Sequence, residues 1–142
     1  MNTRGRRAHV VCRADELGPG QRLIAACGAV EVGVFNLGGE YFALLNRCPH
    51  KSAPLCKGVQ RGYLTADEPR QISISASKEV IGCPWHGWEF EIRTGRSYFN
   101  PHRVRARSYD AARVSGQEIA EEDPSVPTFR VQREDDYIVV YV

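Results

Sequence analysis

Two short segments, Cys-Pro-His at 48–50 and Cys-Pro-Trp-His at 83–86, constrain the fold of this chain more than any other feature. Each follows a stretch with strand character and lies among prolines and glycines, which predicts a loop that projects from a β scaffold. Thiolate and imidazole groups bind borderline and soft transition metals, and four of them that converge make a closed site. The sequence therefore favours a fold in which these two loops can face each other.

The rest of the chain is patterned as short β-strands. Segments 29–37 and 41–46 flank Gly38-Gly39-Glu40, a connection typical of a hairpin, and segments 128–133 and 137–142 flank an acidic turn at 134–136. No stretch of a dozen residues has convincing helical periodicity. The pattern predicts an all-β domain. Further strands are expected at 21–26, 71–75, 80–81, 88–92 and 104–109.

A length of 142 residues predicts one domain that spans 1–142. The regular succession of expected strands is interrupted at 59–79 and at 111–127. Both stretches are expected to be surface insertions. Ser115 and Glu118 have the spacing of a capping box, so residues 111–120 could form a short helix, although a solvated loop is equally open.

Charge and hydropathy exclude two classes of partner. Nineteen Lys and Arg against seventeen Asp and Glu give a net charge of +2, which is too small to predict binding to nucleic acid. No apolar run approaches the roughly 20 residues of a membrane span. The arginines near the start are followed at 9–17 by charged residues where an export signal needs an apolar stretch. These features predict a cytoplasmic protein that is not embedded in a membrane.

The chain has five cysteines, and an odd number fits metal ligation with bystander thiols better than a disulfide scaffold. Three interpretations of Cys48, His50, Cys83 and His86 are open. The four could be unrelated buried cysteines and ordinary histidines. They could bind structural zinc, although zinc fingers usually pair Cys with Cys and His with His. They could instead hold a binuclear iron-sulfur cluster.

A family resemblance supports the third interpretation. The stretches CPHKSAPLCKG at 48–58 and CPWHGWEFEIRTG at 83–95 closely resemble the two cluster-binding boxes of Rieske [2Fe-2S] proteins. The resemblance extends more loosely over about 10–142, and it implies a β-sandwich with a small cluster-binding subdomain whose ligand loops cover 47–58 and 82–95. The 32 residues between His50 and Cys83 are about twice the common spacing of the family. We assign the excess to an excursion through 59–79, which is tolerable because loop-closure entropy grows only logarithmically.

Carried over residue by residue, the resemblance implies that Cys48 and Cys83 bind one iron of a single [2Fe-2S] cluster, while His50 and His86 bind the other. Two ferric ions, two sulfides and two thiolates sum to zero charge, whereas a four-thiolate cluster carries minus two. The neutral cluster is therefore easier to reduce. The remaining thiols, expected to be bystanders, are Cys12, Cys27 and Cys56.

The resemblance also selects a branch of the family. Respiratory-complex members carry a disulfide at the positions of Ala53 and Trp85, and hydrogen-bonding Ser and Tyr residues at the positions of Trp88 and Phe90. Without these donors the potential should lie toward the lower end of the roughly −150 to +300 mV range of Rieske centres. The pattern is similar to that of the ferredoxins and oxygenase domains that serve oxygenases.

The implied function is electron transfer rather than catalysis by the chain alone. An oxygenase also needs a mononuclear iron on two His and a carboxylate, usually in a separate domain, and only His9 and His102 remain here. We therefore expect a Rieske-type ferredoxin that passes electrons from a reductase to a terminal oxygenase. The alternative is a small regulatory or structural subunit, similar to the Rieske-like subunit of assimilatory nitrite reductases.

Basic and aromatic residues accompany the two predicted loops. Trp85 and Trp88 fall in the second loop, and they could form an aromatic surface beside a basic rim that faces an acidic partner. Solvated charges and buried tryptophans are an equally open alternative. The basic residues in or beside the first loop are Arg47, Lys51, Lys57 and Arg61.

Overall fold

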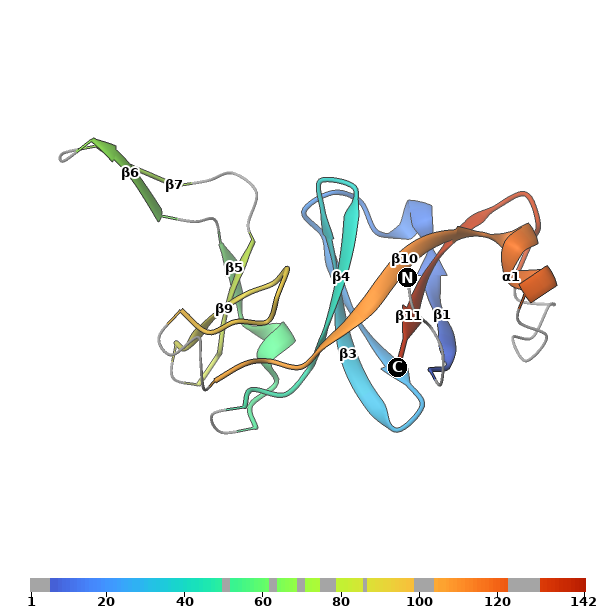
Figure 1. Ribbon diagram of the computed structural model, residues 1–142, viewed down its shortest axis with the longest axis horizontal. Coiled ribbons are helices and arrows are strands. Elements are labelled where there is room, and N and C mark those ends of the chain that lie inside the picture. The colour runs from blue at the N-terminus through green and yellow to red at the C-terminus, as the bar shows by residue number, and fades with distance from the viewer. Residues whose placement is uncertain are drawn as a thin grey trace. The chain divides into compact units, whose positions relative to one another are not determined.

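A computed structural model gives the architecture of the chain (Figure 1). It contains two compact units, one built from Met1–Ala43 and Tyr109–Val142 and the other from Leu44–Ser108. No helix in the described part of the chain is long and apolar enough to cross a membrane. The structure describes residues 6–49, 52–61, 64–68, 71–74, 79–85, 87–98, 104–122 and 131–142.

Six strands form the main sheet, in the order β1-β11-β10-β4-β3-β2. Gly38 and Gly39 connect β3 to β4, and both have positive φ angles (65° and 97°) that suit a tight hairpin turn. This hairpin and the all-β fold class confirm the predictions from the sequence. The strands are β1 (Ala8–Arg13), β2 (Arg22–Cys27), β3 (Val30–Leu37), β4 (Glu40–Leu45), β10 (Ser108–Ser115) and β11 (Asp136–Tyr141).

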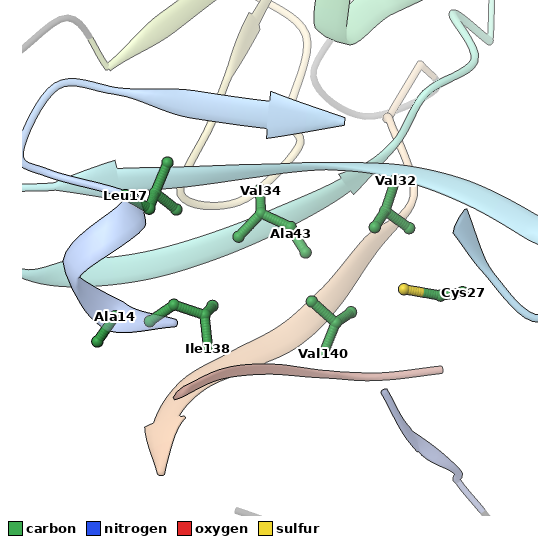
Figure 2. Packing of buried hydrophobic residues seen from close by; sticks show 8 residues of the cluster. All are labelled: Ala14, Leu17, Cys27, Val32, Val34, Ala43, Ile138 and Val140. Atoms are coloured by element: carbon green, nitrogen blue, oxygen red, sulfur yellow. The ribbon is translucent and has the colours of Figure 1, made fainter. Parts of the chain in front are cut away.

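Strand β11 is hydrogen-bonded along both edges, to β1 and to β10, and four consecutive residues, Tyr137 to Val140, are buried. Alternate side chains of a strand point to opposite faces. Ile138 and Val140 accordingly enter one hydrophobic cluster, while Tyr137 and Val139 enter another. Figure 2 shows the first cluster, which consists of Ala14, Leu17, Cys27, Val32, Val34, Ala43, Ile138 and Val140.

The unit at Leu44–Ser108 contains two smaller sheets. Strands β5 (Val59–Arg61), β8 (Val80–Gly82) and β9 (Glu89–Glu91) form one, in the order β5-β8-β9. Strands β6 (Leu64–Glu68) and β7 (Gln71–Ile74) form a separate two-stranded sheet. The excursion expected at 59–79 therefore begins with a strand of the three-stranded sheet, and the β6–β7 hairpin follows it.

The expectations for the C-terminal third differ most from the structure. The strand expected at 104–109 begins at Ser108 and continues to Ser115, because every residue from Asp110 onward pairs with β11. The segment expected to be an insertion from 111 thus begins as sheet. Helix α1 (Gly116–Glu122) follows, and the Glu118 N–H donates to Ser115 Oγ over 3.2 Å. The short helix is therefore present, later than expected.

The predicted C-terminal hairpin is wrong in its described part. Residues 131–133 are not a strand, and residues 128–130 lie outside the described residues. Strand β11 pairs instead with β10 and with β1, and neither pairing was expected from the sequence. Long-range pairing decided both outcomes, since strand propensity depends strongly on the neighbours that a segment finds.

The burial of a valine side chain predicts how much the free energy of unfolding falls when its two methyl groups are removed. Val34 is fully buried in the cluster of Figure 2, whereas Val59 is 72% exposed. We expect Val34→Ala to lower the free energy of unfolding by about 2 kcal/mol, since apolar contact is lost and a cavity remains. Val59→Ala is the matched control and should change it by less than about 0.5 kcal/mol. Urea unfolding followed by circular dichroism measures both, and equal effects would contradict the assigned core.

Candidate metal centre

Strand pairing in the three-stranded sheet brings the two cysteine-containing loops together. Strands β5 and β8 are antiparallel, and Val59, at the start of β5, pairs with Gly82, at the end of β8. The first predicted box ends at Gly58, immediately before β5, and Cys83 immediately follows β8. The two loops therefore adjoin at the same end of this sheet.

Gly58 allows this approach because it has no side chain. A Cβ atom built at Gly58 would overlap the carbonyl group of Gly82, and it would lie 3.1 Å from the carbonyl oxygen of Leu55. Backbone atoms cannot move aside as the end of a flexible side chain can. The Gly58 N–H donates to the Leu55 carbonyl over 3.0 Å, which closes the 3₁₀ turn η2 (Leu55–Lys57) before β5 begins.

The first cysteine loop, residues 48–53, is closed by two backbone hydrogen bonds. The Cys48 N–H donates to the carbonyl of Ala53, and the Ser52 N–H donates to the carbonyl of Cys48, both over 2.7 Å. Ser52 has a φ of 61°, in the left-handed region. Residues 50 and 51 lie outside the described part of this loop.

The second cysteine loop, residues 83–88, repeats this arrangement. The Cys83 N–H donates to the carbonyl of Trp88 over 2.7 Å, and the Gly87 N–H donates to the carbonyl of Cys83 over 3.0 Å. Gly87 has a φ of 69°. Both loops thus use hydrogen bonds at the same sequence spacing and place a left-handed residue four positions after the cysteine. This equivalence was not predictable from the residue pattern, because His50 is two residues and His86 three residues after its cysteine.

Cys48 and Cys83 are both buried, with exposed fractions of 0% and 3%, and neither is in a disulfide. Two buried thiols at equivalent positions of adjoining loops fit one pair of ligands for a metal centre. The other predicted ligands, His50 and His86, lie outside the described residues. Within the described ranges, which omit these histidines, no group of three or more His, Cys, Asp or Glu gathers.

Cys56 lies beside the first cysteine loop and is buried. Its thiol donates to the carbonyl of Leu44 over 3.6 Å, and its N–H donates to Oδ1 of Asn46 over 2.8 Å. Asn46 precedes the loop and Cys56 follows it, so this second bond ties the two flanks together. Sequence reasoning did not single out Asn46, because an asparagine in a turn region has many ordinary roles.

The other two cysteines belong to the unit that contains β1 and β2. Cys27 is buried in the cluster of Figure 2, and half-buried Cys12 packs against that cluster. Burial, followed by the charges of Glu16 and Asp15, raises the pKa of Cys12 to about 11, and burial also raises the pKa of Cys27. Both are therefore neutral thiols near pH 7, as expected for bystanders, since the thiolate is the metal-binding form.

The aromatic residues of the second loop divide between surface and interior. Trp85 is 60% exposed, which confirms half of the expected aromatic surface, whereas Trp88 is only half-exposed. Phe90 is fully buried, and so is Ala53 of the first loop. Neither tryptophan is fully buried, so the alternative of two buried tryptophans is wrong, and the aromatic surface is present at Trp85.

The expected basic rim is also only partly present. Arg47 and Lys57 are exposed, in line with the prediction. Arg61 instead forms an ion pair with Glu89, so its charge is locally balanced. Lys51 lies outside the described residues.

The close approach of Gly58 to the Gly82 carbonyl predicts that a larger residue at position 58 reduces metal binding. Gly58→Ala should reduce the metal bound per purified chain and lower the thermal unfolding temperature, because a methyl group would force β5 and β8 apart. Gly18→Ala is the control, since a Cβ there would meet only the flexible Gln21 side chain, at 3.2 Å. Metal analysis and thermal denaturation test both variants, and normal loading of Gly58→Ala would refute the packing argument.

Comparisons with known proteins identify a family whose model covers both cysteine loops. The family model described as the Rieske [2Fe-2S] domain matches residues 7–110. The biphenyl dioxygenase ferredoxin subunit of Pseudomonas sp. (strain KKS102) is 31% identical over 108 residues, which cover 76% of this chain and 84% of that protein.

Two solved structures share the fold. One is a chain from the complex of reduced oxygenase and oxidized ferredoxin in carbazole 1,9a-dioxygenase, with a TM-score of 0.56, 20% identity, and coverage of 92% of this chain and 91% of that one. The other is a putative NADH-dependent nitrite reductase small subunit from Mycobacterium tuberculosis, with a TM-score of 0.60, 19% identity and 96% coverage of each chain. The extent of the family match and the similarity to the ferredoxin subunit lead to one conclusion: the chain belongs to the Rieske [2Fe-2S] family.

Proposed function

We propose that this protein is a Rieske-type ferredoxin, a one-electron carrier that has no substrate chemistry of its own. The observation that carries the proposal is the pair of equivalent loops at one end of the three-stranded sheet, each with a buried cysteine at its start. The [2Fe-2S] cluster of the family supplies the one-electron couple. Its proposed ligands are Cys48 and Cys83 at one iron and His50 and His86 at the other.

The described residues around the cysteines support this role. Burial of Cys48 and Cys83 keeps water from their sulfur atoms, and the closed loops fix the position of each backbone. The equivalent loops have the same left-handed turn after the cysteine, which favours symmetric placement of the two thiolates. We propose that the insertion relative to the family lies between β5 and β8, where the β6–β7 hairpin is found. We further propose that a second insertion is confined to the part of 111–127 that follows β10, which ends at Ser115.

A terminal oxygenase is the proposed electron acceptor, and a reductase is the proposed donor. Similarity to a dioxygenase ferredoxin subunit supports this assignment. The alternative, a small subunit of a nitrite reductase, is supported by fold alone. A carrier accepts electrons from a reductase and NADH as an isolated protein, whereas a subunit without redox function does not. We further propose a cytoplasmic location, which fractionation of the source cells would test.

The distribution of charge supports an acidic partner. Residues 44–108 contain eleven Lys and Arg against five Asp and Glu, so this segment has a net charge of +6. The rest of the chain has eight against twelve, a net charge of −4. Exposed Arg47 and Lys57 flank the first cysteine loop, and exposed Trp85 lies in the second. Electron-transfer partners form small, weak interfaces in which complementary charge mainly speeds association.

The purified protein should contain two irons and two acid-labile sulfides per chain. The average g value of the reduced protein in electron paramagnetic resonance should be below that of four-thiolate clusters, because imidazoles ligate one iron. Replacement of a ligand in His86→Ala or His50→Cys should abolish this spectrum, since the charge and number of ligands change at that iron.

Cys56→Ser is the matched control for these variants. The Cys56 thiol bonds the Leu44 carbonyl, and a serine hydroxyl could replace that bond, so the spectrum should persist. Zinc without iron in the wild-type protein would contradict the proposed cofactor. Loss of the cluster in Cys56→Ser alone would contradict the proposed ligand set.

The proposed partner surface makes a separate kinetic prediction. Lys57→Glu should slow electron delivery to the acceptor several-fold at low ionic strength, and salt should remove most of the difference. Arg133→Glu makes the same charge change at an exposed position of the other unit and should have a smaller effect. Stopped-flow reduction of the acceptor measures the rates. Equal rates for Lys57→Glu and the wild type at low salt would remove the basic rim from the mechanism.

A further inference from the structure

Ser52 has an unusual backbone conformation for its residue type. Among the described residues it is the only one other than glycine with a positive φ, which is 61°. A side chain in this left-handed region meets the following carbonyl group and costs free energy. At the equivalent position of the second cysteine loop, Gly87 adopts a φ of 69° without that cost. The chain therefore retains a side chain in the first loop where the second loop has none.

The Ser52 side chain makes one contact that glycine could not make. Its Oγ accepts a hydrogen bond from Nε of Arg47 over 3.0 Å. Arg47 immediately precedes Cys48, and the Ser52 N–H donates to the Cys48 carbonyl. The Arg47 side chain thus reaches from the residue before Cys48 to Ser52, which follows it, although Arg47 is exposed. The Arg47 N–H also donates to the Leu45 carbonyl over 2.7 Å, which fixes the backbone from which the side chain departs.

We propose that Ser52 holds the Arg47 guanidinium as a fixed positive charge beside Cys48, and that this charge raises the reduction potential of the cluster. The inference rests on the proposed function, because it takes Cys48 as a ligand. Reduction adds one negative charge to the cluster, and a nearby positive charge favours that state. An arginine free in solvent would spread its charge over many rotamers and be screened, whereas a held guanidinium keeps its position. Arg47 and Ser52 are positioning residues that do not touch the iron.

Two variants test the inference in protein that has been purified with its cluster. Arg47→Gln removes the charge, and it should lower the ratio of reduced to oxidised protein several-fold at a fixed ambient potential. For a one-electron couple, a tenfold change corresponds to 59 mV. Ser52→Gly keeps the charge but removes its anchor, so the decrease should have the same sign and be smaller. Spectroelectrochemical titration at low and high ionic strength measures both, and salt should reduce each difference.

A purely structural role for Ser52 predicts unchanged reduction potentials, so the potential, and not the unfolding temperature, tests the proposal. Ser52→Gly relieves the left-handed strain, so its thermal unfolding temperature should equal or exceed that of the wild type in either case. A potential unchanged in Arg47→Gln and Ser52→Gly, with a normal cluster spectrum, would overturn the proposal. Lys57→Gln is the control, because Lys57 is exposed in the turn that follows the loop. An equal decrease in Lys57→Gln would also overturn the role of the anchor.

These outcomes are distinct from failure of the proposed function. If the wild-type protein binds no iron or sulfide, the assignment of the ligands fails before any potential can be measured. If the wild-type cluster is normal and only the potentials fail to move, the cluster assignment stands and the role of Arg47 and Ser52 is refuted.

Discussion

Antiparallel pairing between β5 and β8 sets Gly58, the last residue of the first cysteine box, beside Gly82, the residue that precedes Cys83. The pair Val59 and Gly82 defines the register, and a shift of one residue would turn every side chain of the strand to the opposite face. Gly58 adds a steric requirement, because only a residue without Cβ fits against the Gly82 carbonyl. Two segments far apart in the sequence are thereby brought side by side, as the proposed shared site requires.

The two cysteine loops have equivalent backbone hydrogen bonds but different residues at the left-handed position. Each cysteine lies at the start of a turn closed by bonds at the same spacing, which makes its backbone rigid without long secondary structure. Gly87 adopts the left-handed position at little cost, whereas Ser52 adopts it with strain and binds Arg47. Strained residues often persist where the surrounding structure holds them and their side chain has a role. The difference between the loops is therefore a difference in surface charge rather than in backbone shape.

The main sheet contributes two hydrophobic clusters, and among the described residues neither cluster contains a member of the cysteine loops. Strand β11 is buried on both faces because its alternate side chains enter two hydrophobic clusters, while β1 and β10 pair with its two edges. Its near-continuous apolar sequence was visible beforehand, but its partners were not. The basic excess of residues 44–108 and the acidic excess elsewhere also show that the small net charge of the chain hides two oppositely charged parts.

The sequence alone determined the all-β class, the β3–β4 hairpin, the family and the two cysteine boxes, since these depend on local patterns and characteristic spacings. Only the tertiary structure decided that β10 continues to Ser115 and that β11 pairs with both β1 and β10. It also decided the equivalence of the loops and the contacts of Ser52 and Asn46. The physical reason is that strand pairing and side-chain hydrogen bonds join residues distant in sequence, and a local sequence pattern does not identify the residue with which each one pairs.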